Sequence, residues 1–476
     1  MGWETVIGLE VHTELSTNTK IFCGCEISFG APPNTCVCPS CTGMPGALPK
    51  LNKMVVEYAM RVGLALNCTI ERNNRFDRKS YFYPDLPNAY QITQLYAPIC
   101  TNGHLDIEVG GTTKRIGIRQ IHMEEDAGKL VHDSSVGGTL VDYNRCGVPL
   151  LEIVTNPDFS NASEAVAFLE KLREILLFLE VSDCRMEQGS MRADVNVSVR
   201  KEGEPLGVRA EMKNLNSFKA ITRAIEYESA RHIQVLENGG ALVQETRRWD
   251  DDKGASFSMR SKENAQDYRY FPDPDLLPVN ISEEWLESVR SSLPELASHK
   301  RERYIETFGL SEYESSILTS HRNIAALFEA IASNSSQPVE SAHLVSGEIM
   351  RLMNNTATPP DDLAVDAEKM STLVGLVANG RINRKTFKDA IELVFTDDSI
   401  DPEKYIEDNK LLMDSSDDAV NTIVDAVLSE NPDAVKDYND GKSKAFGFLM
   451  GQVMRQLAGK GNPDLVRKAL TNALDS

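Results

Sequence analysis

The spacing of apolar residues changes near residue 293, and this change constrains the fold more than any other feature of the sequence. Up to about residue 280, short runs alternate polar and apolar side chains between Gly, Pro and Asn residues. Side chains of a strand point alternately to the two faces of a sheet, so such runs are predicted strands with one polar and one apolar face. The clearest cover residues 4–15, 115–124, 194–200 and 207–215.

Two helical runs interrupt these strands. The first run covers residues 163–179, and either Asn161 or Ser163 at its start can cap a helix. The second run covers residues 217–240 and ends at a glycine pair that can cap its C-terminus. We therefore expect an α+β domain over residues 1–292, with a cradle built on a mostly antiparallel sheet. Residues 267–279 contain three prolines and are expected to cross the surface as the exit from this domain.

Beyond residue 293 the sequence favours helices separated by turn-rich breaks such as 332–341 and 354–362. An all-α domain over 293–400 and a small helical tail over 401–476 are predicted, with the turn-rich stretch 397–402 between them. In the tail, helical i, i+3, i+4 spacing relates Val420, Ile423, Val424, Val427 and Leu428.

Length and charge limit the class of protein. The 476 residues are 41% hydrophobic and 25% charged, as in ordinary globular proteins, and no apolar run approaches the roughly 18 residues of a membrane span. The N-terminus resembles neither a signal nor a transit peptide, so a cytoplasmic protein is predicted. The net charge of −21 argues against nucleic-acid binding by the surface as a whole, because phosphate contacts need cations.

The tail is locally different. Residues 436–468 include seven basic residues and only three acidic ones, and this local excess of positive charge permits RNA binding there. A solvated face of a helical bundle explains the same pattern. The basic residues are Lys436, Lys442, Lys444, Arg455, Lys460, Arg467 and Lys468.

The first predicted strand carries chemistry on its polar face. Glu10, His12 and Glu14 alternate with apolar residues and therefore share one face. Carboxylate and imidazole side by side are plausible ligands for a divalent metal, although a solvated sheet face is the simpler interpretation of this strand alone.

Further charged residues favour the metal hypothesis. Residues 122–129 hold three consecutive carboxylates, and Glu152 lies inside an apolar run, where a carboxylate needs a partner. If these strands converge, their polar faces form a concave sheet suited to a metal and phosphates. The two other strands that carry both signs of charge contribute Arg192, Asp194, Asn196, Arg209, Glu211 and Lys213.

Common nucleotide-binding motifs are absent from the sequence. Gly441-Lys442-Ser443 lacks the upstream glycine of a P-loop, and no G-x-G-x-x-G follows a predicted strand. Any nucleotide site must therefore be of another kind.

Five of the nine cysteines lie between residues 23 and 41. A C-x-C pair and a C-x-x-C pair, twelve residues apart, suit a tetrahedral structural zinc site. The predicted ligands are Cys23, Cys25, Cys38 and Cys41, and Cys36 is a possible competing ligand. Cys68, Cys100, Cys146 and Cys184 are predicted to be small buried or surface residues.

Eight long sequence blocks follow one another over the first 280 residues or so. They are IGLEVHTEL, FDRKSYFYPDLPNAYQITQ, IHMEEDAGK, DYNRCGVPLLEIV, GSMRADVNVSV, AEMKNLNSF, QETRRWD and DYRYFPDPDLLP. These blocks resemble, in the same order, those of the B-subunit family of aspartyl/glutamyl-tRNA amidotransferases, the GatB/GatE family. Residues 439–463 resemble the family's tail, which is related to the small YqeY-type domain.

The resemblance implies a ligase acting in two steps. ATP would phosphorylate the side-chain carboxylate of Glu or Asp mischarged on tRNA(Gln) or tRNA(Asn), and ammonia would displace the phosphate. This chain shows no obvious glutaminase block, so a glutaminase A subunit would supply the ammonia, within a heterotrimer that includes a C subunit. The tail would contact tRNA.

The resemblance also assigns site residues. It implies Mg²⁺ (or Mn²⁺) ligands at His12, Glu125 and Glu152, with Glu10 beside them. Asp194 and Glu211 would contact a second metal or ATP, and Lys79 and Arg192 the phosphates. Some family members lack the cysteines, which implies that zinc is structural and dispensable to the chemistry.

Two other classes remain open without the resemblance. One is a metal-dependent kinase or ligase acting on a small carboxylic acid, which has no use for a basic helical tail. The other is a noncatalytic RNA-binding assembly subunit, in which the acidic residues are surface charge. ATP hydrolysis that depends on mischarged tRNA separates all three.

Overall fold

The computed structural model describes residues 2–133, 137–261, 265–413, 417–457 and 463–474. The chain divides into two compact units, Met1–Leu296 and Ala297–Ser476. Among these described residues, no helix combines the length and apolarity needed to span a membrane.

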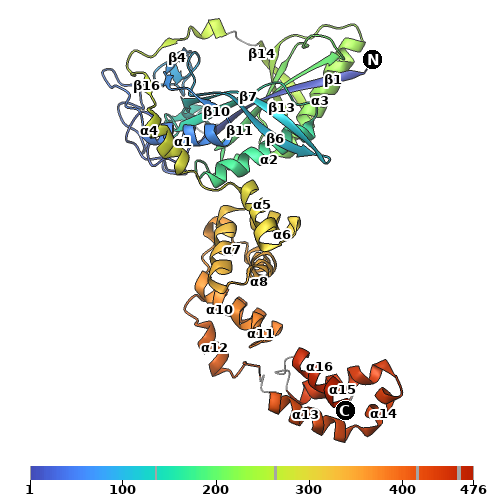
Figure 1. The fold of residues 1–476 in the computed structure, drawn as a ribbon. Helices are drawn as coiled ribbons and strands as arrows, with labels where there is room; N and C mark the ends of the chain where they lie inside the picture. The colour runs from blue at the N-terminus through green and yellow to red at the C-terminus, as the bar shows by residue number, and fades with distance from the viewer. Residues whose placement is uncertain (1, 134–136, 262–264, 414–416, 458–462, 475–476) are drawn as a thin grey trace. The chain divides into compact units, whose positions relative to one another are not determined.

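A nine-stranded sheet forms the centre of the first unit (Figure 1). Its neighbours pair antiparallel except β12 and β13, so the predicted α+β fold with a mostly antiparallel sheet is confirmed. In spatial order the strands are β14 (Ala255–Ser261), β13 (Glu245–Asp250), β12 (Ala210–Lys213), β11 (Met191–Lys201), β1 (Trp3–Glu14), β10 (Pro149–Thr155), β7 (Thr112–Glu125), β6 (Cys100–Val109) and β2 (Thr69–Ile70).

One face of this sheet is apolar and carries the helices. Ile7, Leu9 and Val11 of β1 are buried in one core with side chains of α1 (Lys53–Ala65), α2 (Ala162–Phe178) and α3 (Phe218–Glu237). Burying one such side chain contributes roughly 1.5–3 kcal/mol. The opposite face is polar, because period-two alternation leaves Glu10 and His12 on that side.

The helix ends follow the expected signals. Asn161 accepts a hydrogen bond from the backbone N–H of Glu164 at the start of α2. The glycine pair after α3 lies as predicted, with Gly239 at a φ of +73° and both N–H groups bonded to carbonyls of the last turn. α4 (Glu283–Ser291) then packs on α1.

The exit segment does more than cross the surface. Residues 271–272 form β15 (Phe271–Pro272), which pairs with β4 (Asp77–Ser80), and β4 pairs with β5 (Tyr90–Thr93). Arg78 Nε donates to Asp273 Oδ2 over 2.8 Å, so a buried ion pair fixes this return. A second short pair joins β16 (Val279–Asn280) to β3 (Asn73–Asn74). The exit therefore brings Tyr268 and Tyr270 back to the polar side of the large sheet.

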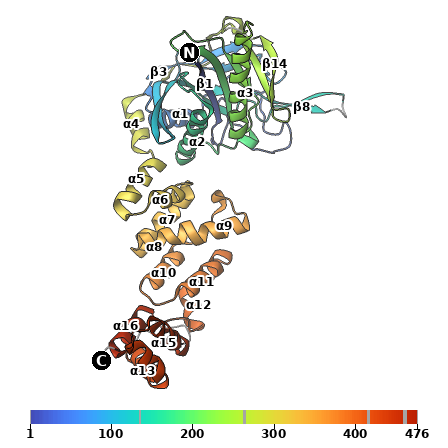
Figure 2. The same cartoon turned by 90° about the vertical axis from the view of Figure 1, so that its right-hand side faces the viewer.

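Three shorter elements complete the first unit. The strands β8 (Lys129–Asp133) and β9 (Gly138–Asp142) form a hairpin that extends away from the large sheet (Figure 2). The two 3₁₀ turns are η1 (Met186–Gln188) and η2 (Ala265–Tyr268).

The second unit is helical and contains two separate apolar cores. The first extends from Tyr304 to Ile406, so α12 packs with α10 and α11 rather than with the tail. Its elements are α5 (Ala297–Phe308), α6 (Glu312–Leu318), α7 (Arg322–Ser335), α8 (Pro338–His343), the π-helical turn η3 (Leu344–Ile349), α9 (Met350–Thr356), η4 (Pro360–Asp362), α10 (Ala367–Ala378), α11 (Arg384–Thr396) and α12 (Pro402–Asp408).

The second core belongs to the tail. Val420, Val424 and Val427 are buried in it, which confirms the helical spacing inferred from the sequence. Its helices are α13 (Asp417–Glu430), α14 (Pro432–Asn439), α15 (Ser443–Gln456) and α16 (Pro463–Leu474).

Candidate active site

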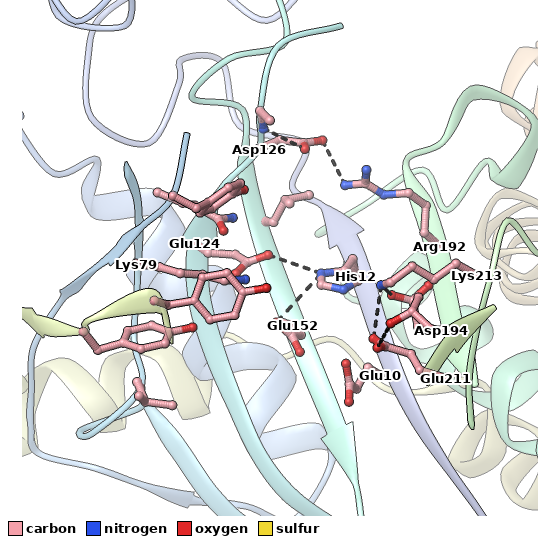
Figure 3. A pocket seen from close by; sticks show the side chains of 18 of the residues that line it. Glu10, His12, Lys79, Glu124, Asp126, Glu152, Arg192, Asp194, Glu211 and Lys213 are labelled. Atoms are coloured by element: carbon pink, nitrogen blue, oxygen red, sulfur yellow. Dashed lines mark hydrogen bonds and ion pairs between the residues drawn. The ribbon is translucent and has the colours of Figure 1, made fainter. Parts of the chain in front are cut away.

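The polar face of the nine-stranded sheet forms one wall of a cavity of about 710 Å³. Side chains of β1, β7, β10, β11 and β12 point into it (Figure 3). Tyr81, which follows β4, and Tyr268 and Tyr270 of the exit segment also line it. Seven of the eight predicted metal, phosphate and catalytic residues meet here, namely Glu10, His12, Lys79, Glu152, Arg192, Asp194 and Glu211.

A first cluster joins three adjacent strands. His12 pairs across the sheet with Glu152, and Glu152 pairs with His122. His12 Nδ1 lies 3.2 Å from Glu124 Oε1 and 4.0 Å from Glu152 Oε2, and His122 Nε2 lies 2.9 Å from Glu152 Oε2. Ligand atoms of His12, Glu124 and Glu152 all lie within 4.8 Å of one another, the arrangement that one cation requires.

The electrostatics of this cluster favour charged forms. Burial alone would lower the pKa of His12, but the charges of Glu152 and Glu124 raise it to about 9. By the same balance the pKa of His122 rises to about 10, and the two imidazoliums hold the pKa of Glu124 well below its usual range. Two protonated histidines thus neutralise carboxylates that a bound cation would otherwise neutralise.

A second cluster lies beside the first, on β1, β11 and β12 (Figure 3). One carboxylate oxygen from each of Glu10, Asp194 and Glu211 falls within 4.8 Å of the others. The Lys213 ammonium donates to Asp194 and lies 3.2 Å from Glu211 Oε1. Burial opposes its charge, yet these two carboxylates raise the pKa of Lys213 above its ordinary value. Asn196 Nδ2 donates to Glu10 Oε1 over 3.0 Å.

Two cationic side chains border the clusters. Arg192 lies opposite His12 in the sheet and donates to Asp126 Oδ2 over 2.9 Å. Lys79, on β4, places Nζ 4.9 Å from the ring centre of Tyr268 and 5.6 Å from that of Tyr81. Ring faces attract the ammonium without neutralising it, so Lys79 stays available to an anion.

Glu125 is the one predicted ligand that does not lie in the cavity. Its carboxylate lies on the core face of β7, where Oε1 accepts from the Ile92 N–H over 3.0 Å. Burial raises its pKa to about 8. Glu124, and not Glu125, lies beside His12 in the cavity.

The alternation of side chains along β7 predicts which faces Glu124 and Glu125 occupy. Ile121 and Met123 are fully buried on the core face, which puts Glu125 with them and His122 and Glu124 opposite. Sequence reasoning counted three carboxylates without assigning their faces. It also missed Tyr268 and Tyr270, since only the return of the exit segment brings them to the cavity.

The four predicted zinc ligands converge elsewhere in the first unit. Thiols of Cys23, Cys25, Cys38 and Cys41 lie within 4.8 Å of one another, as a tetrahedral site requires. The Cys38 N–H donates to Cys41 Sγ over 3.2 Å. A hydrogen bond with Cys23 lowers the pKa of Cys41 to about 4, against the effect of burial, and the ammonium of the fully buried Lys20 lies 3.6 Å from the same sulfur.

The other thiols lie outside this cluster. Cys36 Sγ contacts Glu26 Oε1 at 3.8 Å and is not among the converging thiols. Cys100, Cys146 and Cys184 are buried and Cys68 is half-buried, as predicted for cysteines without a special role.

Clustered imidazole and carboxylate groups on a sheet that lines a cavity are typical of enzymes that act on charged substrates. Comparison with known proteins identifies the family within that class. Residues 5–287 match the GatB/GatE catalytic domain, and residues 326–474 match the GatB domain. The chain belongs to the GatB/GatE family.

Curated relatives match over the whole chain. A protein of Lachnoclostridium phytofermentans is 53% identical over 473 residues, which cover 99% of each chain. Proteins of a Thermoanaerobacter species and of Caldicellulosiruptor bescii are 52% and 51% identical and cover 100% of each chain. All three are named as the B subunit of aspartyl/glutamyl-tRNA(Asn/Gln) amidotransferase.

Proposed function

We propose that this chain activates the side-chain carboxylate of Glu or Asp mischarged on tRNA(Gln) or tRNA(Asn). The carboxylate attacks the γ-phosphorus of ATP, giving an acyl phosphate and ADP. Ammonia then attacks the acyl carbon, phosphate leaves with the C–O bonding pair, and the amide of Gln or Asn remains. The observation that carries the proposal is the pair of cation-ligand clusters that share one cavity with a lysine and an arginine.

ATP is needed because a carboxylate is a poor acyl donor until it carries a good leaving group. Phosphoryl transfer asks the protein mainly for positioning and for neutralisation of charge. Lys79 and Arg192 are suited to phosphate oxygens from opposite borders of the cavity. Arg192 already binds one carboxylate oxygen of Asp126, which orients its guanidinium toward the space beside His12.

The donor sets fit Mg²⁺ or Mn²⁺. His12, Glu124 and Glu152 would hold one ion, and Glu10, Asp194 and Glu211 a second. The ammonium of Lys213 lies against both Asp194 and Glu211, so the carboxylates of the second donor set attract positive charge, which supports a cation site there. When bound, such ions neutralise phosphate charge. A cation at the first set must displace the proton of His12, since only the neutral imidazole is a ligand.

The cysteine cluster would hold a structural zinc ion. Four thiols with an N–H···S bond at Cys41 make a closed donor set with no position left for substrate. Its role in this proposal is to fix the fold of residues 23–41 and not to react.

Two partner subunits and the tRNA complete the proposed reaction. A glutaminase A subunit would deliver ammonia, and a C subunit would complete a heterotrimer in the cytoplasm. Six of the seven basic tail residues lie in the described part and are exposed, which suits contact with tRNA phosphates; Lys460 lies outside the described residues. Because α12 belongs to the preceding core, we place the start of the tail after Met413.

One assay tests the proposal against its alternatives. The reconstituted complex is given ATP with mischarged Glu-tRNA(Gln), mischarged Asp-tRNA(Asn), uncharged tRNA or free amino acid. Hydrolysis only with mischarged tRNA, followed by amide formation with glutamine, is expected. Hydrolysis with free acid would indicate a small-molecule kinase, and no hydrolysis would indicate a noncatalytic assembly role.

A further inference from the structure

A groove of about 360 Å³ lies next to the active cavity on the polar face of the sheet. Glu10 and Arg209 line both spaces, so the two adjoin at these residues. Its β1 floor includes Gly8, which has no side chain. One wall is Asn156–Pro157, after β10, and the other is residues 206–209, before β12.

Two arginines of the groove, Arg119 and Arg209, are exposed. Within the described part of the chain, neither side chain forms an ion pair or hydrogen bond. By contrast, Arg192 is paired with Asp126 and Lys213 with Asp194 on the same face. Two uncommitted guanidinium groups in a chain of net charge −21 indicate a site for an anion.

The backbone aims both arginines into this space. β7 and β10 shift register between Val154 and Thr155, which pair with Gln120 and Ile118, so Arg119 is an extra residue without a partner. Such a bulge turns a side chain that strict alternation would place differently. Arg209 precedes Ala210, which is fully buried, and therefore points to the polar face.

The floor of the groove also carries uncharged groups that can contact a ligand. Asn196 donates to Glu10, but its buried Oδ1 accepts no hydrogen bond from any residue that the structure describes. Beside it lie the small residues Gly8 and Ser198 and the apolar Leu206, which is 58% exposed. Cations, an acceptor amide and exposed apolar surface together suit a flexible chain of phosphates, riboses and bases better than a compact inorganic anion.

We propose that this groove binds the single-stranded 3′ end of the aminoacyl-tRNA, with Arg119 and Arg209 on its phosphates. The inference rests on the proposed function: the amino acid is esterified to the terminal ribose, so the last nucleotides must lie in space adjoining the cavity that holds its carboxylate. Arg209, at the junction, contacts the phosphate nearest the amino acid, and Arg119 contacts one further along.

The test compares Arg119→Ala and Arg209→Ala with Arg115→Ala in the full reconstituted complex. Arg115 is a matched control. It is an exposed arginine of β7, the strand of Arg119, but its guanidinium pairs with Asp106 over 2.7 Å. Two probes are used: mischarged tRNA in the ATP hydrolysis assay, and a short single-stranded RNA with the tRNA 3′ sequence in a binding titration at several salt concentrations.

Loss of one charged contact should raise KM for mischarged tRNA, and Kd for the short RNA, by about tenfold. The slope of log affinity against log salt should fall by about 0.7 for each lost phosphate contact to a single strand. KM for ATP should stay within twofold of wild type, and Arg115→Ala should match wild type throughout.

Two results would overturn the inference. One is unchanged KM for tRNA in both variants, and the other is a rise confined to KM for ATP, which would assign the groove to the nucleotide. A wild-type complex with no tRNA-dependent hydrolysis is a different failure, since it removes the proposed function. Short-RNA binding that is lost in Arg119→Ala and Arg209→Ala would still support an RNA groove in that case.

Discussion

Two of the three candidate metal-ligand clusters that the described residues of the first unit form are built in opposite ways. The cysteine ligands come from one stretch of 19 residues, Cys23 to Cys41, and converge through local turns. The carboxylate and imidazole ligands come from β1, β7 and β10, strands far apart in the chain. Local ligands can be identified from their spacing, whereas ligands on separate strands depend on sheet register.

The comparison also separates structural from chemical roles. The thiols satisfy one another and leave no open position, which suits an ion that stabilises a fold. The carboxylates line a cavity of about 710 Å³ that can admit a large substrate. Removing a thiol should therefore cost stability first, and removing a carboxylate should cost activity first.

The largest expected effect is on the strand-borne cluster. Glu124→Gln removes the charge that faces His12 and His122, so tRNA-dependent ATP hydrolysis should fall by about 10²-fold or more, as when one transition-state contact is lost. His12→Ala should behave alike. Glutaminase activity of the partner subunit should survive. The measurement is ADP release by the reconstituted complex with saturating mischarged tRNA.

Glu125→Gln is the matched control for this variant. The amide oxygen can still accept from Ile92, so activity should stay within about tenfold of wild type. Equal losses in the two variants would contradict the placement of Glu124, and a larger loss in Glu125→Gln would restore the ligand set inferred from the family blocks.

The loop-borne cluster should respond in stability. Cys38→Ser should release zinc and lower the Tm, because binding free energy at a structural site is folding free energy. A loss of about 2 kcal/mol corresponds to roughly 3 °C in a unit of this size. Metal content and thermal unfolding are measured on protein purified without chelators.

Cys36→Ser provides the comparison, since its thiol lies outside the cluster but in the same segment. It should keep close to one zinc per chain and the wild-type Tm. Wild-type protein without zinc would remove the structural role from all four ligands.

A smaller effect is expected on the pH dependence of stability, through the buried carboxylate of Glu228 beside the β12–β14 side of the sheet. Glu228, fully buried on α3, accepts from Arg231 and from Ser256 of β14. Burial opposes its charge, but these hydrogen bonds and that from His232 lower its pKa to about 2. The stability it contributes is therefore present above its unfolded pKa, near 4.5, and is lost as pH falls toward 2.

Unfolding by urea between pH 7 and pH 3 checks this. The carboxylate of Glu228 should account for roughly 2 kcal/mol of the loss by pH 3. Glu228→Gln should be less stable than wild type at pH 7 and should lose that much less on acidification. Glu226→Gln, an exposed change on the same helix, should follow the wild-type curve. Parallel curves for all three proteins would mean that Glu228 does not hold the sheet through its charge.

The smallest effect is expected in the helical tail, which contributes no ligand to either cluster. Lys442 and Lys444 are exposed, and Lys442 pairs with Asp437. Charge reversal at both should weaken different tRNAs alike, about threefold to tenfold, and lower the salt slope by roughly 0.9 per lost contact to paired RNA phosphates. Deletion after Met413 should flatten the slope further while ATP binding survives.

Reversal at Lys404 and Lys410, exposed residues before the tail, is the control with the same change in charge. Titration of tRNA at several salt concentrations compares the variants. Identical slopes for both pairs and for the truncated protein would make the tail a solvated bundle.

The sequence by itself determined a large part of this protein. Period-two runs predicted the strands and placed Glu10 and His12 opposite Leu9 and Val11, because backbone geometry alone sets that alternation. Cysteine spacing identified the four thiols that converge, since a short loop limits where they can go. The family blocks identified the family, and helical spacing identified the core of the tail.

Only the tertiary structure decided which polar faces meet. β1 lies between β10 and β11, so Glu10 meets Asp194, and His12 meets Glu152, through pairings that no local rule fixes. The bulge at Arg119 and the return of Tyr268 and Tyr270 depend on register and on the Arg78–Asp273 ion pair. These contacts join residues far apart in the chain, and long-range packing free energy selects them, whereas alternation and ligand spacing are properties of a few neighbouring residues.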